Sequence, residues 1–530
     1  MEVPDAMEIL RYAGGLAAIW FVSVACYGLL FDPLRHIPGP FLARMTDAYA
    51  GWFAFGKTLH IATYHNFQKY GPVVRQGPRR VVFNTVAALH DIYPSAKLNK
   101  GGAYAASILA GSKNSLFNAI DRDAHRRKRR FVGEALTERS MRAFEPAMRN
   151  EIDVFLRLVL KSTSGNEPVD MTPLLQHLGI DIVGMLAFGY PLRTQTEETN
   201  RFLQTAIDGT AWRVNVYMQF PILRFLERLI MLIGMVQIAR FRNKVSHMIE
   251  TRLAEPADAR QDLYKAVSKH TPIEPASTGK RSKADEEVMA ELVSDALFFI
   301  MAGGNTTATS MCSTFFYLSR NKAAYDRLAA EIRSTFQSDD EICSGPKLNS
   351  CKYLRACIDE SIRMSTPSPA IFWREPDEKG SKAKGSVVIE GHAIPSGTQV
   401  GVNLYSILHN EEYFPDSFTW NPDRWHQDKG DGIKSTKAFA PFLLGDRACA
   451  GRGMAYMEAS LVIARTIWLF DFEAAPGTAG ELGGGTIDQE GVQGGRGEYQ
   501  LRDVFAAEHD GPNLVFRTRG EHWKVFEAIH

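Results

Sequence analysis

The stretch Phe442-Leu443-Leu444-Gly445-Asp446-Arg447-Ala448-Cys449-Ala450-Gly451 decides how the rest of this sequence is interpreted. It places a cysteine between two glycines, and glycine lets a backbone approach a bound group closely. Backbone N–H groups around a sulfur atom stabilise its thiolate form, which is the form that binds metals. The segment therefore favours a loop that can stabilise the Cys449 thiolate, and a structural cysteine beside a turn is the alternative.

The remaining cysteines do not share this setting. They show no regular spacing and form no Cys-x-x-Cys pair, which argues against a disulfide scaffold. We expect Cys312, Cys351 and Cys357, which lie in apolar or helical segments, to be small buried hydrophobic residues. The other two are Cys26 and Cys343.

Composition indicates a large globular protein. The chain has 530 residues, of which 45% are hydrophobic and 11% aromatic, and this is enough to bury a sizeable core. The formal net charge is +1, so there is no electrostatic reason to expect nucleic acid or another polyanion as a partner. A small neutral substrate is the simpler expectation.

Hydrophobic periodicity predicts more helix than strand. A long helix that is apolar all round is expected over Asp285–Asn321, buried through the centre of the fold. Alternation around two glycines predicts strands over Val387–Val402, and glycine density predicts a surface loop over Ala475–Gly497. Further helices are expected over Asn321–Phe336, Leu354–Met364 and Met454–Phe470.

Three shorter motifs accompany the cysteine segment. Ala302-Gly303-Gly304-Asn305-Thr306-Thr307 lies within the long central helix, where each glycine costs about 1 kcal/mol relative to alanine. Close packing against another helix would explain these glycines without any chemistry. Glu360-Ser361-Ile362-Arg363 puts opposite charges three residues apart on one helix face, and Pro422-Asp423-Arg424-Trp425 stands between it and Cys449.

Together these motifs resemble those of the cytochrome P450 family. The cysteine segment matches F-x-x-G-x-R-x-C-x-G at every fixed position. The segments Glu360–Arg363 and Pro422–Trp425 resemble the family's E-x-x-R helix and the P-E-R-F-like motif that follows it. The resemblance covers nearly the whole chain and is greatest to the microsomal, filamentous-fungal branch. It implies a mainly α fold with smaller β sheets, in which Glu360, Arg363 and Arg424 form a network that supports the cysteine loop.

The resemblance also implies a cofactor, haem b (iron protoporphyrin IX), with the Cys449 thiolate as its axial ligand. A thiolate pushes electron density onto iron and favours O–O cleavage. Arg447 is then expected to face a haem propionate. His125 and Arg129 match the propionate-contacting positions of the family's C helix, and Arg374 matches a third basic residue that binds a propionate.

The basic tract His125–Arg130 would otherwise be interpreted as a solvated helix face or a nucleic-acid patch. The resemblance suggests instead that its remaining bases dock an acidic reductase. NADPH–cytochrome P450 reductase is the expected partner, because this chain contains no evident dinucleotide or flavin motif.

In the central helix, the resemblance assigns Ala302–Thr307 to the A-G-x-D/E-T-T segment. That segment widens the helix over the iron, making a groove for dioxygen and water, and its threonine relays protons. Thr306 is the expected relay. Asn305 stands where an acid is usual, and an amide orders water but does not exchange a proton at neutral pH. We therefore expect a water-mediated route through Thr306.

The beginning of the chain predicts a membrane anchor. Tyr12 to Phe31 contains no charge, and at about 1.5 Å per residue this stretch just spans a hydrocarbon core. A cleaved signal peptide is the competing interpretation. Acidic residues precede the stretch while Arg35 and Arg44 follow it, which favours a single-pass anchor in the endoplasmic reticulum membrane with the body in the cytosol.

A proline hinge, Ile37-Pro38-Gly39-Pro40, follows the anchor. We therefore divide the chain into an anchor with the start of the hinge, residues 1–37, and one catalytic domain, residues 38–530. The apolar tract Phe220–Ile238 is interrupted by charges, so it is expected to be a core helix or a helix that dips into the bilayer near a substrate entrance.

The resulting functional prediction is a haem-thiolate monooxygenase. It would insert one oxygen atom from O2 into a hydrophobic small molecule, an intermediate of fungal secondary metabolism such as a polyketide, terpenoid or alkaloid. A haem-thiolate isomerase or dehydratase that needs no reductase, and a non-catalytic haem carrier or sensor, are the alternatives. Substrate identity is expected to lie in residues 101–117, 208–223 and 368–372.

Overall fold

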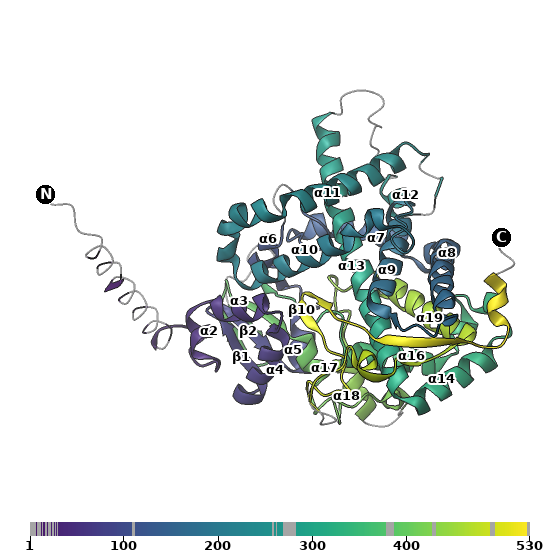
Figure 1. Ribbon diagram of the computed structural model, residues 1–530. Helices are drawn as coiled ribbons and strands as arrows, with labels where there is room; N and C mark the ends of the chain where they lie inside the picture. Colours follow the sequence, from purple (N-terminus) through teal and green to yellow (C-terminus); the bar gives the residue numbers. More distant parts are fainter. Residues whose placement is uncertain are drawn as a thin grey trace.

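The computed structural model describes residues 30–108, 112–256, 259–260, 262–268, 282–377, 386–426, 431–487 and 493–526, with isolated positions before residue 30. Helices form most of the molecule and the sheets are small, which confirms the mainly α prediction (Figure 1). The α-helices are α2 (Phe41–Met45), α3 (Ala48–Phe55), α4 (Leu59–Tyr70), α5 (Val86–Ile92), α6 (Gly102–Ala106), α7 (Arg122–Ala135), α8 (Glu138–Thr163), α9 (Met171–Phe188), α10 (Phe202–Gln219), α11 (Glu227–Leu253), α12 (Leu263–Ser268), α13 (Lys283–Arg320), α14 (Lys322–Thr335), α15 (Pro346–Asn349), α16 (Lys352–Met364), α17 (Leu404–Leu408), α18 (Asp431–Ala438) and α19 (Arg452–Leu469).

One sheet joins the beginning of the chain to its C-terminal half. Strand β1 (Val73–Gly77) pairs antiparallel with β2 (Arg80–Phe83), and β2 pairs in parallel with β8 (Gln399–Val402). All three strands are buried throughout. Figure 1 shows helices α2 to α5, in purple, gathered around this sheet.

The other sheets are small. A three-stranded sheet has the order β4-β12-β9, and the remaining three are two-stranded pairs, β3 with β5, β6 with β7, and β10 with β11. Their bounds are β3 (Leu98–Asn99), β4 (Val169–Asp170), β5 (Glu375–Pro376), β6 (Val387–Ile389), β7 (His392–Ile394), β9 (Phe470–Ala474), β10 (Arg502–Val504), β11 (Ala506–Glu508) and β12 (Asn513–Thr518).

Helix α13 runs through the centre of the molecule, as the sequence predicts. Its first turn is fixed by a capping box, in which the Ser282 hydroxyl accepts from the backbone N–H of Asp285 and the Asp285 carboxylate accepts from that of Ser282. The helix packs against α9, α16 and α19. Its apolar residues belong to the largest hydrophobic core of the molecule, together with those of α8, α9, α16 and α19.

The other predicted elements are present with small shifts of their ends. The three further helices correspond to α14, α16 and α19, and the predicted strands correspond to β6, β7 and β8. Residues 475–497 contain one short 3-10 helix, Gly477–Glu481, and otherwise turns and irregular backbone, with residues 488–492 outside the described part of the chain.

Two membrane-related predictions meet different outcomes. Most of the predicted anchor, Tyr12 to Phe31, lies outside the residues that the structure describes. Within the described residues, one helix is long and apolar enough to cross a membrane, α9, but most of it is buried against neighbouring elements.

The tract Phe220–Ile238 is not one core helix, because a 3-10 helix, Pro221–Leu226, precedes α11 and exposes Ile222, Phe225 and Leu226.

Candidate active site

A cavity of about 370 Å³ lies inside the molecule. Its walls come from the cysteine loop, which contributes Cys449, and from α13, which contributes Thr306. Helix α7 adds His125 and Arg129. Three segments that are far apart in sequence and were assigned to one cofactor therefore line one space.

The cysteine loop is held by its own backbone and by packing. The Cys449 N–H donates to the Phe442 carbonyl at 2.8 Å, which closes the loop. Gly445 has a φ of +76°, and a Cβ there would lie 2.6 Å from the Tyr93 carbonyl oxygen. Gly445 is thus required by its own backbone conformation and by the Tyr93 segment, whereas sequence reasoning had explained the glycines by approach to the porphyrin.

The Cys449 thiol faces the cavity. Burial raises its pKa, while the backbone N–H groups of Gly451 and Arg452 and the charge of Arg129 act in the opposite direction. A metal ion bound at the sulfur would remove the proton outright. The loop thus offers a sulfur ligand with backbone donors already aimed at it.

Basic side chains crowd one end of the cavity. Arg129, Arg374 and Arg447 line it, and Lys100 joins them. Burial lowers the pKa of Lys100 well below its usual value, and the three arginines lower it further. His125 is buried beside the same cations, which with burial lower its pKa to about 3, so its imidazole is neutral at physiological pH.

Several of these cations are anchored in fixed positions. Arg447 donates to the Ala119 carbonyl at 2.6 Å and to Asn99 Oδ1 at 2.9 Å. Arg129 donates to the Ala448 carbonyl at 2.6 Å, which ties α7 to the cysteine loop. Arg374 donates through Nη1 to the Tyr104 hydroxyl at 3.2 Å.

This arrangement fits a haem. Arg374 Nη2 is buried without a hydrogen-bond partner among the described residues. The buried cations repel one another, and the Arg374 Nη2 group lacks a hydrogen-bond acceptor. Anionic oxygen atoms would relieve both effects. The two propionates of a haem would provide them at the end of a cavity that also presents the Cys449 sulfur.

Sequence reasoning missed Lys100. Its ammonium donates to the Phe117 carbonyl and lies over the Tyr104 ring. The only signal in the sequence was a lysine directly before two glycines, at the edge of a stretch already assigned to the substrate. Nothing in that local pattern shows that the lysine turns inward.

The two candidate catalytic residues on α13 point in different directions. Thr306 lines the cavity, and its hydroxyl donates to the Ala302 carbonyl at 2.6 Å. Asn305 is buried and bonds to α10 instead, where its Nδ2 donates to Asp208 Oδ1 at 2.8 Å. Only Thr306 is in direct reach of a group bound in the cavity.

The glycine pair of α13 has a packing explanation. The helix is continuous α-helix from Lys283 to Arg320, with no π-type turn in this described segment. A Cβ at Gly303 would lie 2.6 Å from a methyl group of Val183, and one at Gly179 would lie 2.6 Å from the Gly304 carbonyl oxygen. The alternative interpretation, close packing between helices, therefore accounts for these glycines.

The predicted contacts among Glu360, Arg363 and Arg424 are confirmed. Arg363 donates to both carboxylate oxygens of Glu360, at 2.9 and 3.0 Å, and Arg424 donates to Glu360 Oε1 at 2.9 Å. Glu360 and Arg363 are fully buried. A planar guanidinium suits such a bidentate contact better than an ammonium group.

The basic tract on α7 divides into two groups. Lys128 is buried and pairs with Asp295 of α13 at 2.6 Å, so it is not available to a partner protein. Arg126, Arg127 and Arg130 are exposed. The docking face predicted from the whole tract therefore shrinks to these three arginines.

The helical fold and the cavity that joins a loop cysteine to a threonine of the central helix define a haem-thiolate protein. The family model "Cytochrome P450" matches residues 38–482. The chain belongs to the cytochrome P450 family.

Comparison with known proteins agrees. The cytochrome P450 monooxygenase poxM of Penicillium oxalicum is 33% identical, over 94% of this chain and 93% of its own. The cytochrome P450 monooxygenase apf7 of Gibberella fujikuroi is 32% identical, over 94% and 96%. The chain is accordingly a cytochrome P450 monooxygenase, an oxidoreductase that uses haem with a cysteine thiolate ligand.

A solved structure shows the same fold. The crystal structure of a cytochrome P450 titled CYP102L1 superposes with a TM-score of 0.68 and covers 87% of this chain and 94% of that chain. Its sequence identity is 18%, so this likeness concerns the fold alone.

Proposed function

We propose that this monooxygenase uses haem b and NADPH–cytochrome P450 reductase to insert one oxygen atom from O2 into an apolar intermediate of fungal secondary metabolism. The observation that carries the proposal is the cavity that presents the Cys449 sulfur at one wall and the Thr306 hydroxyl at another. When bound, haem supplies the activation of dioxygen. We place this activity in one catalytic domain, residues 38–530.

The residues of the cavity take separate roles in this proposal. The Cys449 thiolate would bind the iron. Arg129, Arg374, Arg447 and Lys100 would hold the propionates, and the neutral His125 ring would donate one hydrogen bond to them. The Thr306 hydroxyl holds a water molecule at the cavity wall and passes a proton to that water.

Aromatic side chains support an apolar substrate. The Phe117 ring stacks on Phe298 at 5.5 Å between centroids and meets Phe505 edge-on at 5.1 Å, and Phe505 in turn meets Phe372 at 5.0 Å. All four rings line the cavity. A polyketide, terpenoid or alkaloid skeleton suits such a surface, and the fungal sources of the relatives support this class.

The reductase is proposed to dock on α7. Arg126, Arg127 and Arg130 are exposed on this helix, and Arg129 of the same helix contacts the carbonyl of Ala448 in the cysteine loop. An acidic partner attracted to these arginines would therefore come close to the thiolate side of the cofactor.

Exposed apolar side chains support a membrane location. Trp52 is 75% exposed and Phe225 is 86% exposed. Their elements are adjacent, because α3 packs against α10 and α10 against the 3-10 helix Pro221–Leu226. We propose that this surface lies on the endoplasmic reticulum membrane, with residues 12–31 as a single-pass anchor and the catalytic domain in the cytosol.

Spectroscopy and isotope labelling test the proposal. Purified protein should show the red-shifted Soret band of the reduced carbonyl complex, and Cys449→Ser should abolish it. Metabolite profiling of a host that lacks the gene should reveal an accumulated precursor. That precursor, supplied with reductase and NADPH, should gain one atom from labelled O2, whereas turnover without NADPH or O2 would instead indicate an isomerase or dehydratase.

A further inference from the structure

The acid that the central helix lacks is present on a neighbouring helix. Asn305 occupies the position of α13 where the family pattern has an acid, and it donates through Nδ2 to Asp208 Oδ1 of α10 at 2.8 Å. Gln204, one turn earlier on α10, donates to Asp208 at 2.9 and 3.0 Å and to Asn305 Oδ1 at 3.1 Å. The three side chains form a closed cluster beside Thr306.

The cluster connects the protein surface to the interior. Asp208 is partly exposed and its neighbour Gly209 is exposed, whereas Asn305 is only 4% exposed. Ile207 and Thr210, on either side of Asp208 along α10, line the cavity. Asp208 is therefore a residue with partial access to solvent that is joined through Asn305 to the turn of α13 that carries Thr306.

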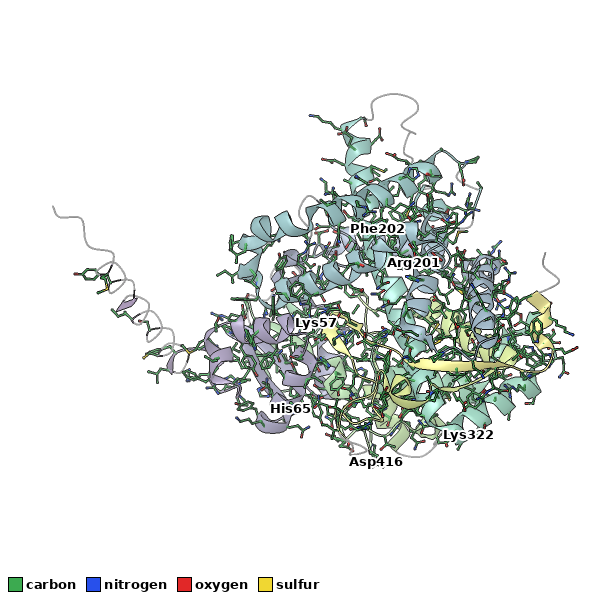
Figure 2. The ribbon with its side chains drawn as sticks, in the orientation of Figure 1. Lys57, His65, Arg201, Phe202, Lys322 and Asp416 are labelled. Atoms are coloured by element: carbon green, nitrogen blue, oxygen red, sulfur yellow. The ribbon has the colours of Figure 1, made fainter. Side chains whose placement is uncertain are left out.

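Charged groups around Asp208 come from two further elements. Glu508 of β11 forms an ion pair with Lys57, which follows α3, at 2.5 Å. Figure 2 shows Lys57 where the N-terminal elements meet the C-terminal strands. Burial raises the pKa of Asp208 and the charge of Glu508 adds to this, while the amides of Gln204 and Asn305 and the charge of Lys57 act against it.

We propose that Asp208 supplies the proton that an acid at position 305 would otherwise supply, with Asn305 as a positioning residue. This inference rests on the proposed monooxygenase function. A proton leaves the Asp208 carboxyl for a water molecule that hydrogen-bonds to the Asn305 amide, and that water protonates the Thr306 hydroxyl as Thr306 releases its own proton into the cavity. The Asp208 carboxylate then regains a proton from solvent.

The decisive variant is Asp208→Asn, because an asparagine keeps the acceptor oxygen for Asn305 and Gln204 but cannot release a proton. We expect NADPH oxidation by the holoenzyme with reductase, measured without added substrate, to fall about a hundredfold, the lower end of what a positioned acid contributes. The charge-swapped variant Asp208→Asn/Asn305→Asp should regain most of the rate, because it returns an acid to α13. An unchanged rate in Asp208→Asn, or no recovery in the swapped variant, overturns the proposal.

A second measurement does not depend on turnover. Infrared difference spectra of the ferric holoenzyme between acidic and alkaline pH should contain a band from a protonated carboxyl group. Asp208→Asn should remove this band, and Glu508→Gln should lower the pH at which it titrates. Removing the Glu508 charge lowers the pKa of Asp208, so the sign is fixed. A spectrum that Asp208→Asn leaves unchanged contradicts the assignment.

The two levels of the argument fail in distinguishable ways. If the unmodified protein lacks the carbonyl Soret band or does not oxidise NADPH with reductase, the monooxygenase proposal itself fails. If both are present but Asp208→Asn behaves like the unmodified protein, only the role of Asp208 fails. Glu508→Gln is the comparison variant for turnover, because it lowers the pKa of Asp208 but leaves the Asp208 carboxyl and its hydrogen bonds to Gln204 and Asn305 in place.

Discussion

At the residue scale, Lys100 shows how electric charge is balanced in the cofactor pocket. It is 6% exposed, and burial together with the charges of Arg374, Arg447 and Arg129 lowers its pKa. Such a group is unfavourable in a pocket of cations unless an anion joins them. A haem propionate would restore its charge, so Lys100 couples cofactor binding to the stability of this pocket.

Replacing Lys100 should weaken haem binding. Loss of one charge-assisted hydrogen bond, about 1.5–3 kcal/mol, corresponds to roughly a tenfold to hundredfold loss of affinity in Lys100→Gln. Haem transfer to an excess of apomyoglobin would measure it. Lys97→Gln is the control, because Lys97 is exposed three residues earlier. Equal haem loss in both variants would contradict the inward role of Lys100.

Glu458 of α19 presents a different buried charge. It is fully buried, both of its carboxylate oxygens lack a hydrogen-bond partner among the described residues, and burial raises its pKa to about 8. Because the folded-state pKa lies above that of the unfolded chain, protonated Glu458 favours the folded state at low pH. This contribution declines as pH rises from about 4.5 through 8.

Glu458→Gln should therefore change the pH dependence of stability. In the unmodified protein, Glu458 alone removes about 1.4 kcal/mol of unfolding free energy for each pH unit across that range. The variant should lack this slope and become the more stable protein above pH 8. Denaturant unfolding at several pH values measures this, and parallel curves for the two proteins would show that Glu458 does not titrate as expected.

At the element scale, α9 and α13 approach closely because small residues face each other. Gly304 and Gly179 meet at their backbones, as the short distance from a Cβ at Gly179 shows. The contact fixes the position of α13, and of Thr306 on it, relative to α9. The glycine pair is therefore structural first, and its effect on the site is indirect.

Gly179→Ala should separate the two helices. The added methyl group would lie 2.6 Å from the Gly304 carbonyl oxygen, and overpacking of this kind costs about 1–3 kcal/mol. Gly133→Ala in α7 is the matched control, because a Cβ there meets nothing within 4 Å and alanine favours a helix by about 1 kcal/mol. Thermal unfolding should show changes of opposite sign, and stabilisation by both variants would refute the packing argument.

These elements also show what the sequence could predict. The central helix, α14, α16, α19 and the strands near residue 400 follow from periodicity, and the Glu360 network follows from spacing and motif. The partners of Gly304, Asn305 and Lys100 could not be foreseen, since Gly179, Asp208 and Arg374 come from other elements and leave no local pattern. The same holds for Lys128, whose pairing with α13 is invisible in a basic run.

At the scale of the whole molecule, exposed apolar side chains are concentrated where α3 and the 3-10 helix after α10 lie. Trp212 donates from its indole N–H to the Phe55 carbonyl at 3.0 Å, which joins α10 to the end of α3. The Phe55 and Trp212 rings meet edge-on at 5.2 Å. The apolar surface is thus part of a firm scaffold and not a collection of isolated side chains.

This surface should bind lipid without the N-terminal segment. We expect a chain that begins at residue 38 to co-sediment with phosphatidylcholine vesicles, and the double variant Trp52→Ser/Phe225→Ser to bind at least about tenfold more weakly, because each aromatic ring contributes about 1.5–3 kcal/mol when fully buried. Val388→Ser is the control, since Val388 is exposed on the β6–β7 hairpin. Equal binding by all variants would exclude the surface as a lipid contact.

The parallel pairing of β2 with β8 has a consequence for biosynthesis. Residues 80–83 leave the ribosome long before residues 399–402. The edge of β2 that pairs with β8 therefore stays unpaired while most of the polypeptide is still being made. Nascent chains that stall before residue 399 should therefore be strong clients of chaperones. Quality control of this protein would then act late in translation, when the second half of the chain closes the first sheet.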